Sequence, residues 1–217
     1  MTRARPAAAQ RGFTFLEMMA VIVVLAIVGG LGVQALQMTT GASSTTVFQS
    51  ELDARAHRVL TRVVRELQEA EGLSFLPSPL EPFGADAFDY RCAEISDAER
   101  IVMGDYRRLE LLPAGNDPRD GVDNDGDGLI DEHELWLVRD VGLASEYRTI
   151  LARAVSAYLE GEAPNAADDN GNGIIDERGF NVALRDGILH VRLSLQGRSP
   201  RDEIVTRIAE TKVWVRN

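Results

Sequence analysis

The sequence predicts an α+β fold, in which a long N-terminal helix with a membrane half and an amphipathic half packs on an antiparallel sheet with acidic loop insertions. Three observations support this fold class: an apolar segment near the N-terminus, a following stripe of apolar residues at helical spacing, and a series of short alternating segments beyond residue 73. Beyond the membrane segment, about 150 to 180 residues remain, which is enough for one domain with its own core.

Composition narrows the function classes. The formal net charge of −11 argues against a nucleic-acid partner, because such a partner requires a basic face. The single cysteine, Cys92, excludes an intrachain disulfide framework.

The apolar segment is long enough to cross a membrane. Residues 18–33 carry no charge, and the whole segment from 13 to 36 has 24 residues, which would span roughly 30 Å of hydrocarbon with some tilt. The residues before it include three arginines and no acid, which places the N-terminus in the cytoplasm and the remainder outside; they are Arg3, Arg5 and Arg11. The alternative is a secretory signal peptide, but a small-residue cleavage pattern is missing after the run.

The residues Gly12-Phe13-Thr14-Phe15-Leu16-Glu17 resemble the class III signal of type IV prepilins and type II secretion pseudopilins. In that signal a short basic leader ends in Gly, and Phe and an apolar run with Glu at its fifth position follow. The resemblance implies that residues 1–12 are a leader, that a prepilin peptidase of the inner membrane cleaves between Gly12 and Phe13, and that Phe13 is N-methylated. It also implies assembly with other pilin or pseudopilin subunits.

Glu17 has a physical role that agrees with this resemblance. A carboxylate at membrane depth is retained only where it finds a partner. Cleavage would place the α-amino group of Phe13 at the same depth, so Glu17 of one subunit could pair with that amine on a neighbour and favour one axial stagger. The alternative is a glutamate that reaches the headgroups without a partner.

The second half of the helix, residues 37–72, is predicted to be amphipathic. An apolar stripe at steps of three and four would pack on a sheet, and the opposite face is charged. The stripe contains Phe48, Leu52, Ala56, Val59, Val63, Leu67 and Ala70; the charged face contains Glu51, Arg55, Arg58, Arg62, Arg65 and Glu69. A helix from Phe13 to Ala70 would be about 85 Å long. Residues 39–46 are poor in helix formers and predict a flexible joint.

Residues 73–217 are predicted to form a β-rich domain. Six segments alternate or are rich in β-formers, and Asp186-Gly187 predicts a tight hairpin turn between two of them. The segments are 87–92, 106–112, 134–139, 180–184, 188–195 and 211–216. Residues 147–161 fit either an amphipathic helix or a strand. The C-terminal strands also resemble those of minor pseudopilins of the J or PilW-like type.

The first acidic motif, residues 123–134, fits the EF-hand loop pattern D-x-D-x-D-G-x-x-D-x-x-E. Ca²⁺ requires six to eight oxygen ligands, and alternate residues of a tight turn direct side chains inward. The expected ligands are the carboxylates of Asp123, Asp125 and Asp127, the Leu129 carbonyl, Asp131 directly or through a water, and a bidentate Glu134. Gly128 permits the turn, and Ile130 is expected to anchor the loop in the core. Residues 117–134 contain eight acids against Arg119 alone, so their mutual repulsion favours a bound cation.

The second acidic motif, residues 168–179, repeats this pattern 45 positions later. Its expected ligands are Asp168, Asn170, Asn172, the Ile174 carbonyl and Asp176. Gly179 stands where the first motif has Glu134, so this loop should bind Ca²⁺ more weakly or use Glu177 instead. Glu177 has a counterpart in Glu132, and the spacing leaves open whether these two residues replace the twelfth-position ligand.

Both motifs lie between predicted strands, so we expect calcium-clamped hairpin connections that order long loops rather than EF-hand sensors that open. Extracellular calcium modules have Kd values of about 10⁻⁴ to 10⁻³ M, which suits the outside of the cell or the periplasm.

The sequence gives no sign of an enzyme. No histidine pair or Cys/His pair has zinc-ligand spacing, and neither a phosphate-binding glycine loop nor a nucleophile elbow occurs. The leading hypothesis is therefore a minor pilin or pseudopilin stabilised by calcium. The alternatives are a membrane-anchored calcium-binding or adhesion module outside the cytoplasm, and an envelope enzyme whose pocket gathers distant residues.

Overall fold

The computed structural model describes residues 14–70, 74–95 and 101–214, apart from the side chains of residues 35–43 and 95. It contains one long helix, α1 (Phe15–Gln68), followed by seven strands. The chain divides into two compact units, residues 1–44 and 45–217, which are described separately. Gly12 and Phe13, the predicted cleavage site, lie outside the described residues.

The first unit contains the N-terminal part of α1. Residues Phe15–Gln34 form a helical segment of 20 residues that is apolar and long enough to cross a membrane, and none of it is buried within the protein. At 1.5 Å per residue this segment matches the thickness of a bilayer core of roughly 30 Å. α1 is helical throughout residues 39–46, and the division between the two units falls within this stretch. The flexible joint stays a prediction.

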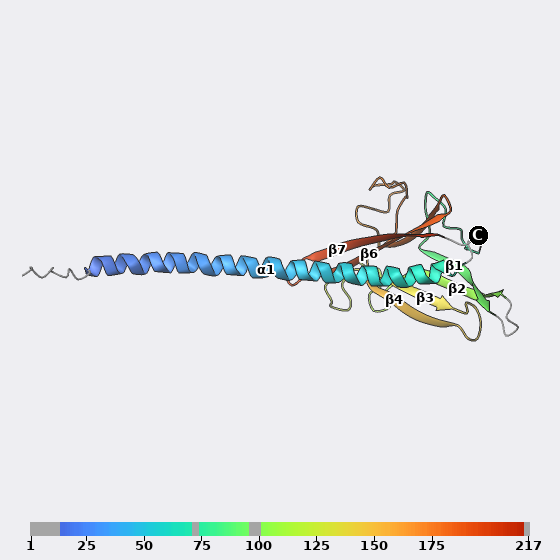
Figure 1. The fold of residues 1–217 in the computed structure, drawn as a ribbon, viewed down its shortest axis with the longest axis horizontal. Helices are drawn as coiled ribbons and strands as arrows, with labels where there is room; N and C mark the ends of the chain where they lie inside the picture. The colour runs from blue at the N-terminus through green and yellow to red at the C-terminus, as the bar shows by residue number, and fades with distance from the viewer. Residues whose placement is uncertain (1–13, 71–73, 96–100, 215–217) are drawn as a thin grey trace, which may run out of the picture. The chain divides into compact units, whose positions relative to one another are not determined.

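The second unit is an antiparallel sheet with the C-terminal part of α1 packed on it (Figure 1). The predicted apolar stripe is the packing face: Ala56, Val63 and Leu67 are completely buried, and the six predicted charged positions on the opposite face are exposed. Burying each large aliphatic side chain contributes about 1.5–3 kcal/mol, so this stripe attaches the helix to the sheet. The α+β fold predicted from the sequence is confirmed.

The sheet follows the order β1-β2-β3-β4-β6-β5, and β7 pairs with β6. All pairs are antiparallel. The strands are β1 (Ala87–Ile95), β2 (Ile101–Pro113), β3 (His133–Arg139), β4 (Tyr147–Val155), β5 (Phe180–Arg185), β6 (Ile188–Arg198) and β7 (Ile204–Trp214). Each of the six predicted strand segments lies in one of these strands or overlaps it.

Two local expectations are resolved by this topology. Residues 147–155 form a strand, β4, rather than a helix. Asp186 and Gly187 both have positive φ angles, 52° and 76°, and they connect β5 to β6 at the paired residues Arg185 and Ile188. Two successive positive φ angles are typical of the tight hairpin turn that Asp-Gly predicts.

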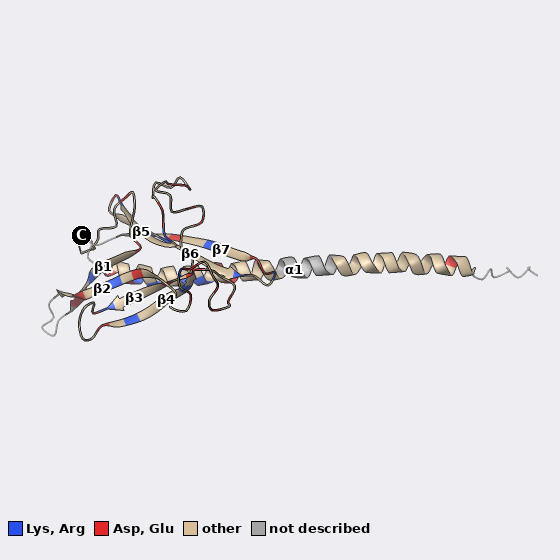
Figure 2. Cartoon of the chain, turned by 180° about the vertical axis from the view of Figure 1, so that it is seen from behind, with Lys and Arg blue, Asp and Glu red and all other residues tan. Residues whose placement is uncertain are grey.

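The two acidic motifs lie in separate connections. The first loop, residues 114–132, joins β2 to β3, which pair directly, so the prediction of a hairpin connection is confirmed there. The second loop, residues 156–179, joins β4 to β5. The hairpin prediction is wrong for this loop, because β6 lies between β4 and β5 in the sheet. Figure 2 marks the acidic residues along both loops in red.

Candidate functional site

Glu17 caps the N-terminus of α1. Its carboxylate accepts hydrogen bonds from the backbone N–H and the hydroxyl of Thr14, at 2.8 and 3.0 Å, and its own N–H donates to the Thr14 hydroxyl at 3.3 Å. This reciprocal arrangement is a capping box, in which Thr14 is the N-cap residue. This role was not predicted from the sequence, although Thr14 and Glu17 have the T-x-x-E spacing. Phe13, the expected donor of the partner amine, lies outside the described residues.

The first loop brings three predicted ligands together. Carboxylate oxygens of Asp123, Asp125 and Asp127 lie within 4.8 Å of one another. Hydrogen bonds from the loop's own backbone hold these side chains in place: Asp123 accepts the N–H groups of Gly126 and Gly128, at 2.7 and 2.9 Å. Asp125 accepts the N–H of Asp127 at 3.0 Å. Because the backbone fixes them, the three carboxylates could bind a cation with little rearrangement.

The turn of the first loop depends on Gly128. Its φ is +87°, and a Cβ atom there would lie 2.0 Å from Nη1 of Arg198. Leu129 is buried, with 3% of its surface exposed, whereas Ile130 is 52% exposed. The prediction that Ile130 anchors the loop is therefore wrong. Leu129 anchors it, because the turn at Gly128 directs the seventh side chain, rather than the eighth, inward.

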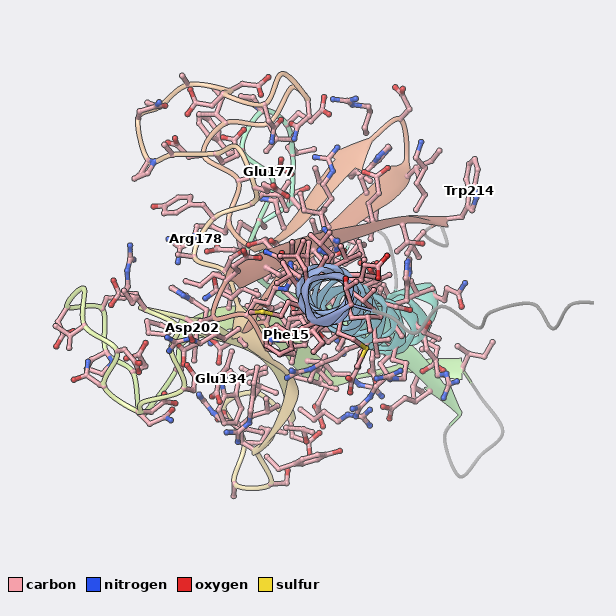
Figure 3. All side chains as sticks on the ribbon, turned by 90° about the vertical axis from the view of Figure 1, so that its left-hand side faces the viewer. Phe15, Glu134, Glu177, Arg178, Asp202 and Trp214 are labelled. Atoms are coloured by element: carbon pink, nitrogen blue, oxygen red, sulfur yellow. The ribbon has the colours of Figure 1, made fainter. Side chains whose placement is uncertain are left out.

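The other two predicted ligands of the first loop make different contacts. Oδ1 of Asp131 accepts the backbone N–H groups of Asp120 and Gly121, both at 3.0 Å. Glu134 lies within β3, where its carboxylate is buried and is 3.6 Å from the guanidinium of Arg153. Figure 3 labels Glu134.

Two further carboxylates of the first loop are buried, and each has one oxygen without a hydrogen-bond partner among the described residues. Asp117 is fully buried and Glu132 is 4% exposed, and one oxygen of each has no hydrogen-bond partner in the described structure. Burial, together with the adjacent Asp117 carboxyl group, raises the pKa of Glu132 to about 7. The pKa of Asp117 is lowered, chiefly because its carboxylate accepts the N–H of Asn124, at 2.9 Å. Buried carboxylates rarely lack a donor or a cation.

The second loop repeats the backbone geometry of the first. Asp168 accepts the N–H groups of Gly171 and Gly173, at 2.7 and 2.8 Å. Asn170 accepts the N–H of Asn172 at 3.1 Å, and Asn172 accepts that of Ile174 at 2.8 Å. Oδ1 of Asp176 accepts the N–H groups of two earlier loop residues at 3.0 Å each, as Asp131 does; these residues are Asn165 and Ala166. The side chain of Ile174 is buried, like that of Leu129.

The side chains at the centre of the second loop differ from those of the first. The Nδ2 group of Asn172 donates to Oε2 of Glu177, and Oε1 of the buried Glu177 is 2.6 Å from a guanidinium nitrogen of Arg192, on β6. Glu177 therefore has two donors, whereas its counterpart Glu132 has an oxygen without one. Gly179, at the twelfth position, cannot be replaced by a larger residue without a shift, because a Cβ there would lie 1.8 Å from the carbonyl oxygen of Ser156.

A buried histidine links the two loops. His133 follows Glu132 in the sequence, and Arg178 follows Glu177; Figure 3 labels Glu177 and Arg178. The guanidinium of Arg178 donates to Nε2 of His133 at 2.8 Å, and Nδ1 of His133 lies 3.0 Å from the Asp131 carbonyl. Burial and the Arg178 charge lower the pKa of His133 to about 4, so the neutral ring accepts from Arg178 and donates to the carbonyl.

Three residues of these loops and their surroundings were not predicted from the sequence as functional: Asp117, Arg178 and Arg192. The 45-residue offset that relates the two motifs could have revealed the first two, because it also relates Asp117 to Glu162 and His133 to Arg178. Arg192 lies outside the repeat on β6, and no local signal in the sequence identifies it.

Comparison with known proteins adds one finding. A family model described as the prokaryotic N-terminal methylation motif matches residues 8–33, the segment that contains the apolar helix and Glu17. Neither the curated proteins nor the solved structures contain a match. Proteins with this motif are structural subunits rather than enzymes, are processed by a prepilin peptidase, and anchor in the inner membrane with the C-terminal domain outside. Residues 8–33 of the chain therefore carry the N-terminal methylation motif, the class III signal found in type IV pilins and pseudopilins.

Proposed function

We propose that this protein is a minor pilin or pseudopilin, a structural subunit of a type II secretion pseudopilus or a type IV pilus. The observation that carries the proposal is the methylation motif over residues 8–33, which includes Glu17 and most of an apolar helical segment that is long enough to cross a membrane. Such a helix needs a bilayer or neighbouring helices to cover it. After cleavage at Gly12, the α-amino group of Phe13 pairs with Glu17 of a neighbouring subunit in the filament.

The domain beyond the helix faces the periplasm or the cell exterior, where its two loops contact calcium. Asp123, Asp125 and Asp127 give the first loop the stronger site, because three carboxylates meet there. The second loop has one carboxylate and two amides at the equivalent positions, so it binds more weakly. In both loops the cation stabilises a long connection that buries few apolar side chains.

The pilin proposal is tested by the mass and N-terminal sequence of the protein purified from its own membrane. We expect a chain that begins at methylated Phe13. A chain that still carries Arg3 to Gly12 would contradict the proposal, because Glu17 would then have no partner amine. That result would favour the alternative, a membrane-anchored calcium-binding or adhesion module. The three clustered carboxylates of the first loop also support this alternative.

Calcium stabilisation is tested by thermal unfolding of the full chain in detergent micelles. Addition of EDTA should lower Tm by on the order of 5 °C, because ligand binding to the folded state alone adds to its stability. The double substitution Asp123→Ala with Asp125→Ala should reduce this calcium-dependent part of Tm more than Asp168→Ala does. An unchanged Tm in EDTA would remove calcium from the proposal, and the opposite ranking of the variants would make the second loop the main site.

A further inference from the structure

The two loops share one scaffold, and this scaffold identifies the residue that closes the cation site. The carboxylates at the ninth position, Asp131 and Asp176, are used in both loops to accept backbone N–H groups. The twelfth position is Glu134 in one loop and an obligatory glycine in the other. The tenth position differs from these two, because it carries a buried glutamate in both loops: Glu132 in the first and Glu177 in the second.

The second loop shows where the tenth side chain points. Oε2 of Glu177 accepts a hydrogen bond from Nδ2 of Asn172, the residue at the fifth position. The equivalent pair in the first loop is Glu132 and Asp127, which are both acidic and cannot bond to each other in this way when ionised. Asp125, Asp127 and Glu132 line the same cavity.

Beside this cavity, which Arg55 and Arg153 also line, two buried carboxylate oxygens have no hydrogen-bond partner in the described structure. Glu132 and Asp117 are both more than nine-tenths buried, and Oε2 of Glu132 and Oδ2 of Asp117 have no donor. Glu134 also lines this cavity, but Arg153 balances its charge at 3.6 Å. A divalent cation between Glu132 and the triad would satisfy these oxygens and offset the cost of burying them.

We propose that Glu132, and not Asp131 or Glu134, completes the cation site formed by Asp123, Asp125 and Asp127. Asp117 adds a second buried anion beside Glu132. In the second loop, Arg192 supplies positive charge to the carboxylate of Glu177, and the amide of Asn172 donates a hydrogen bond to it. These two groups take the place of the cation that binds Glu132 in the first loop. This inference rests on the calcium part of the proposed function, and it explains why the second loop is the weaker site.

The test is calorimetric titration of CaCl₂ into the calcium-free full chain in detergent micelles. Glu132→Gln should weaken Ca²⁺ binding at the stronger site by at least about tenfold, because it removes a ligand charge. The matched control, Glu134→Gln, changes a buried glutamate two residues away and should change the affinity less than about threefold. In EDTA, Glu132→Gln should melt at or above the wild-type Tm, because it removes a buried charge that has no partner.

The outcomes separate the two levels of the proposal. If the wild-type chain binds no calcium, both the calcium part of the proposed function and this inference are overturned. If the wild type binds calcium and Glu132→Gln binds equally well, or Glu134→Gln loses as much affinity, only the assignment of Glu132 is overturned. Should Glu132→Gln fail to unfold cooperatively, Glu132→Asp and Glu134→Asp replace the pair, and the same ranking of affinities is expected.

Discussion

At the scale of single residues, the closest link between α1 and the sheet beyond the apolar stripe is Glu66. Its carboxylate lies 3.0 Å from a guanidinium nitrogen of Arg107 on β2, and it also pairs with Arg139 on β3. The side chains of Glu66 and Arg107 are only 15% and 14% exposed, so solvent cannot easily replace the lost partner of either one. When an ion pair is this buried, removing one partner leaves the other charge buried and uncompensated. The resulting loss of stability is larger than the net contribution of the intact pair.

We therefore expect Glu66→Ala to lower the free energy of unfolding by about 2–3 kcal/mol, because it leaves two arginines without their shared carboxylate. Chemical denaturation of the full chain in detergent micelles would measure the change. Glu69→Ala is the matched control on the same helix: Glu69 is 61% exposed and 4.0 Å from Arg107, so its loss should cost less than about 0.5 kcal/mol. Equal effects of the two substitutions would mean that helix propensity, rather than the ion pairs, decides the result.

The residue scale is also where prediction from sequence was weakest. The spacing D-x-D-x-D-G predicted that Asp123, Asp125 and Asp127 lie close together, and they do. This was predictable because hydrogen bonds within one short turn determine their positions. The burial of Asp117 and the pairing of Glu177 with Arg192 depend on how each loop packs on strands distant in sequence. No local pattern contains that information.

At the scale of elements, the turn between β5 and β6 allows the cost of backbone strain to be measured without any change in side-chain contacts. Gly187 has a φ of +76°, and a Cβ there would meet nothing within 4 Å. Gly187→Ala should therefore lower the free energy of unfolding by about 1 kcal/mol through backbone strain alone. Gly115→Ala is the control, since Gly115 also has open space around it but no left-handed φ. Denaturation curves of both variants would check this, and equal stabilities would contradict the role of the turn.

Helices and strands were predicted correctly wherever the spacing of apolar residues reflects burial of one face. The stripe from Leu52 to Leu67 is buried, and all six predicted strand segments coincide with strands or overlap them, because alternation and helical spacing both arise from packing on a single core. Residues 147–161 fitted two periods, and only pairing with β3 selects the strand β4. The connection after β4 was predicted wrongly, because the position of β6 between β4 and β5 is a property of the topology and leaves no trace in the loop's sequence.

At the scale of the whole molecule, the chain joins a helix that needs apolar surroundings to a domain that is strongly acidic in its loops. Residues Phe15–Gln34 have no buried surface in the protein itself, and the described residues of this span carry one ionisable group, Glu17. Membrane insertion alone would favour an uncharged residue at that position, since a charge near the bilayer core costs a few kcal/mol. The retained carboxylate therefore has a role either in capping α1 or in pairing with another subunit.

The substitution Glu17→Gln separates these two roles. Glutamine at the third helical position can still accept the Thr14 hydrogen bonds, so the helix cap remains while the charge is lost. If the charge pairs with the amine of Phe13 on a neighbour, Glu17→Gln should reduce incorporation into filaments by at least about tenfold.

Thr14→Ala removes the side chain of the capping residue but keeps the charge, and it should assemble at close to the wild-type level. Immunoblots of the sheared filament and membrane fractions would measure both variants. Normal assembly of Glu17→Gln, together with loss of assembly in Thr14→Ala, would assign Glu17 to the helix cap and remove the intersubunit ion pair from the proposed mechanism.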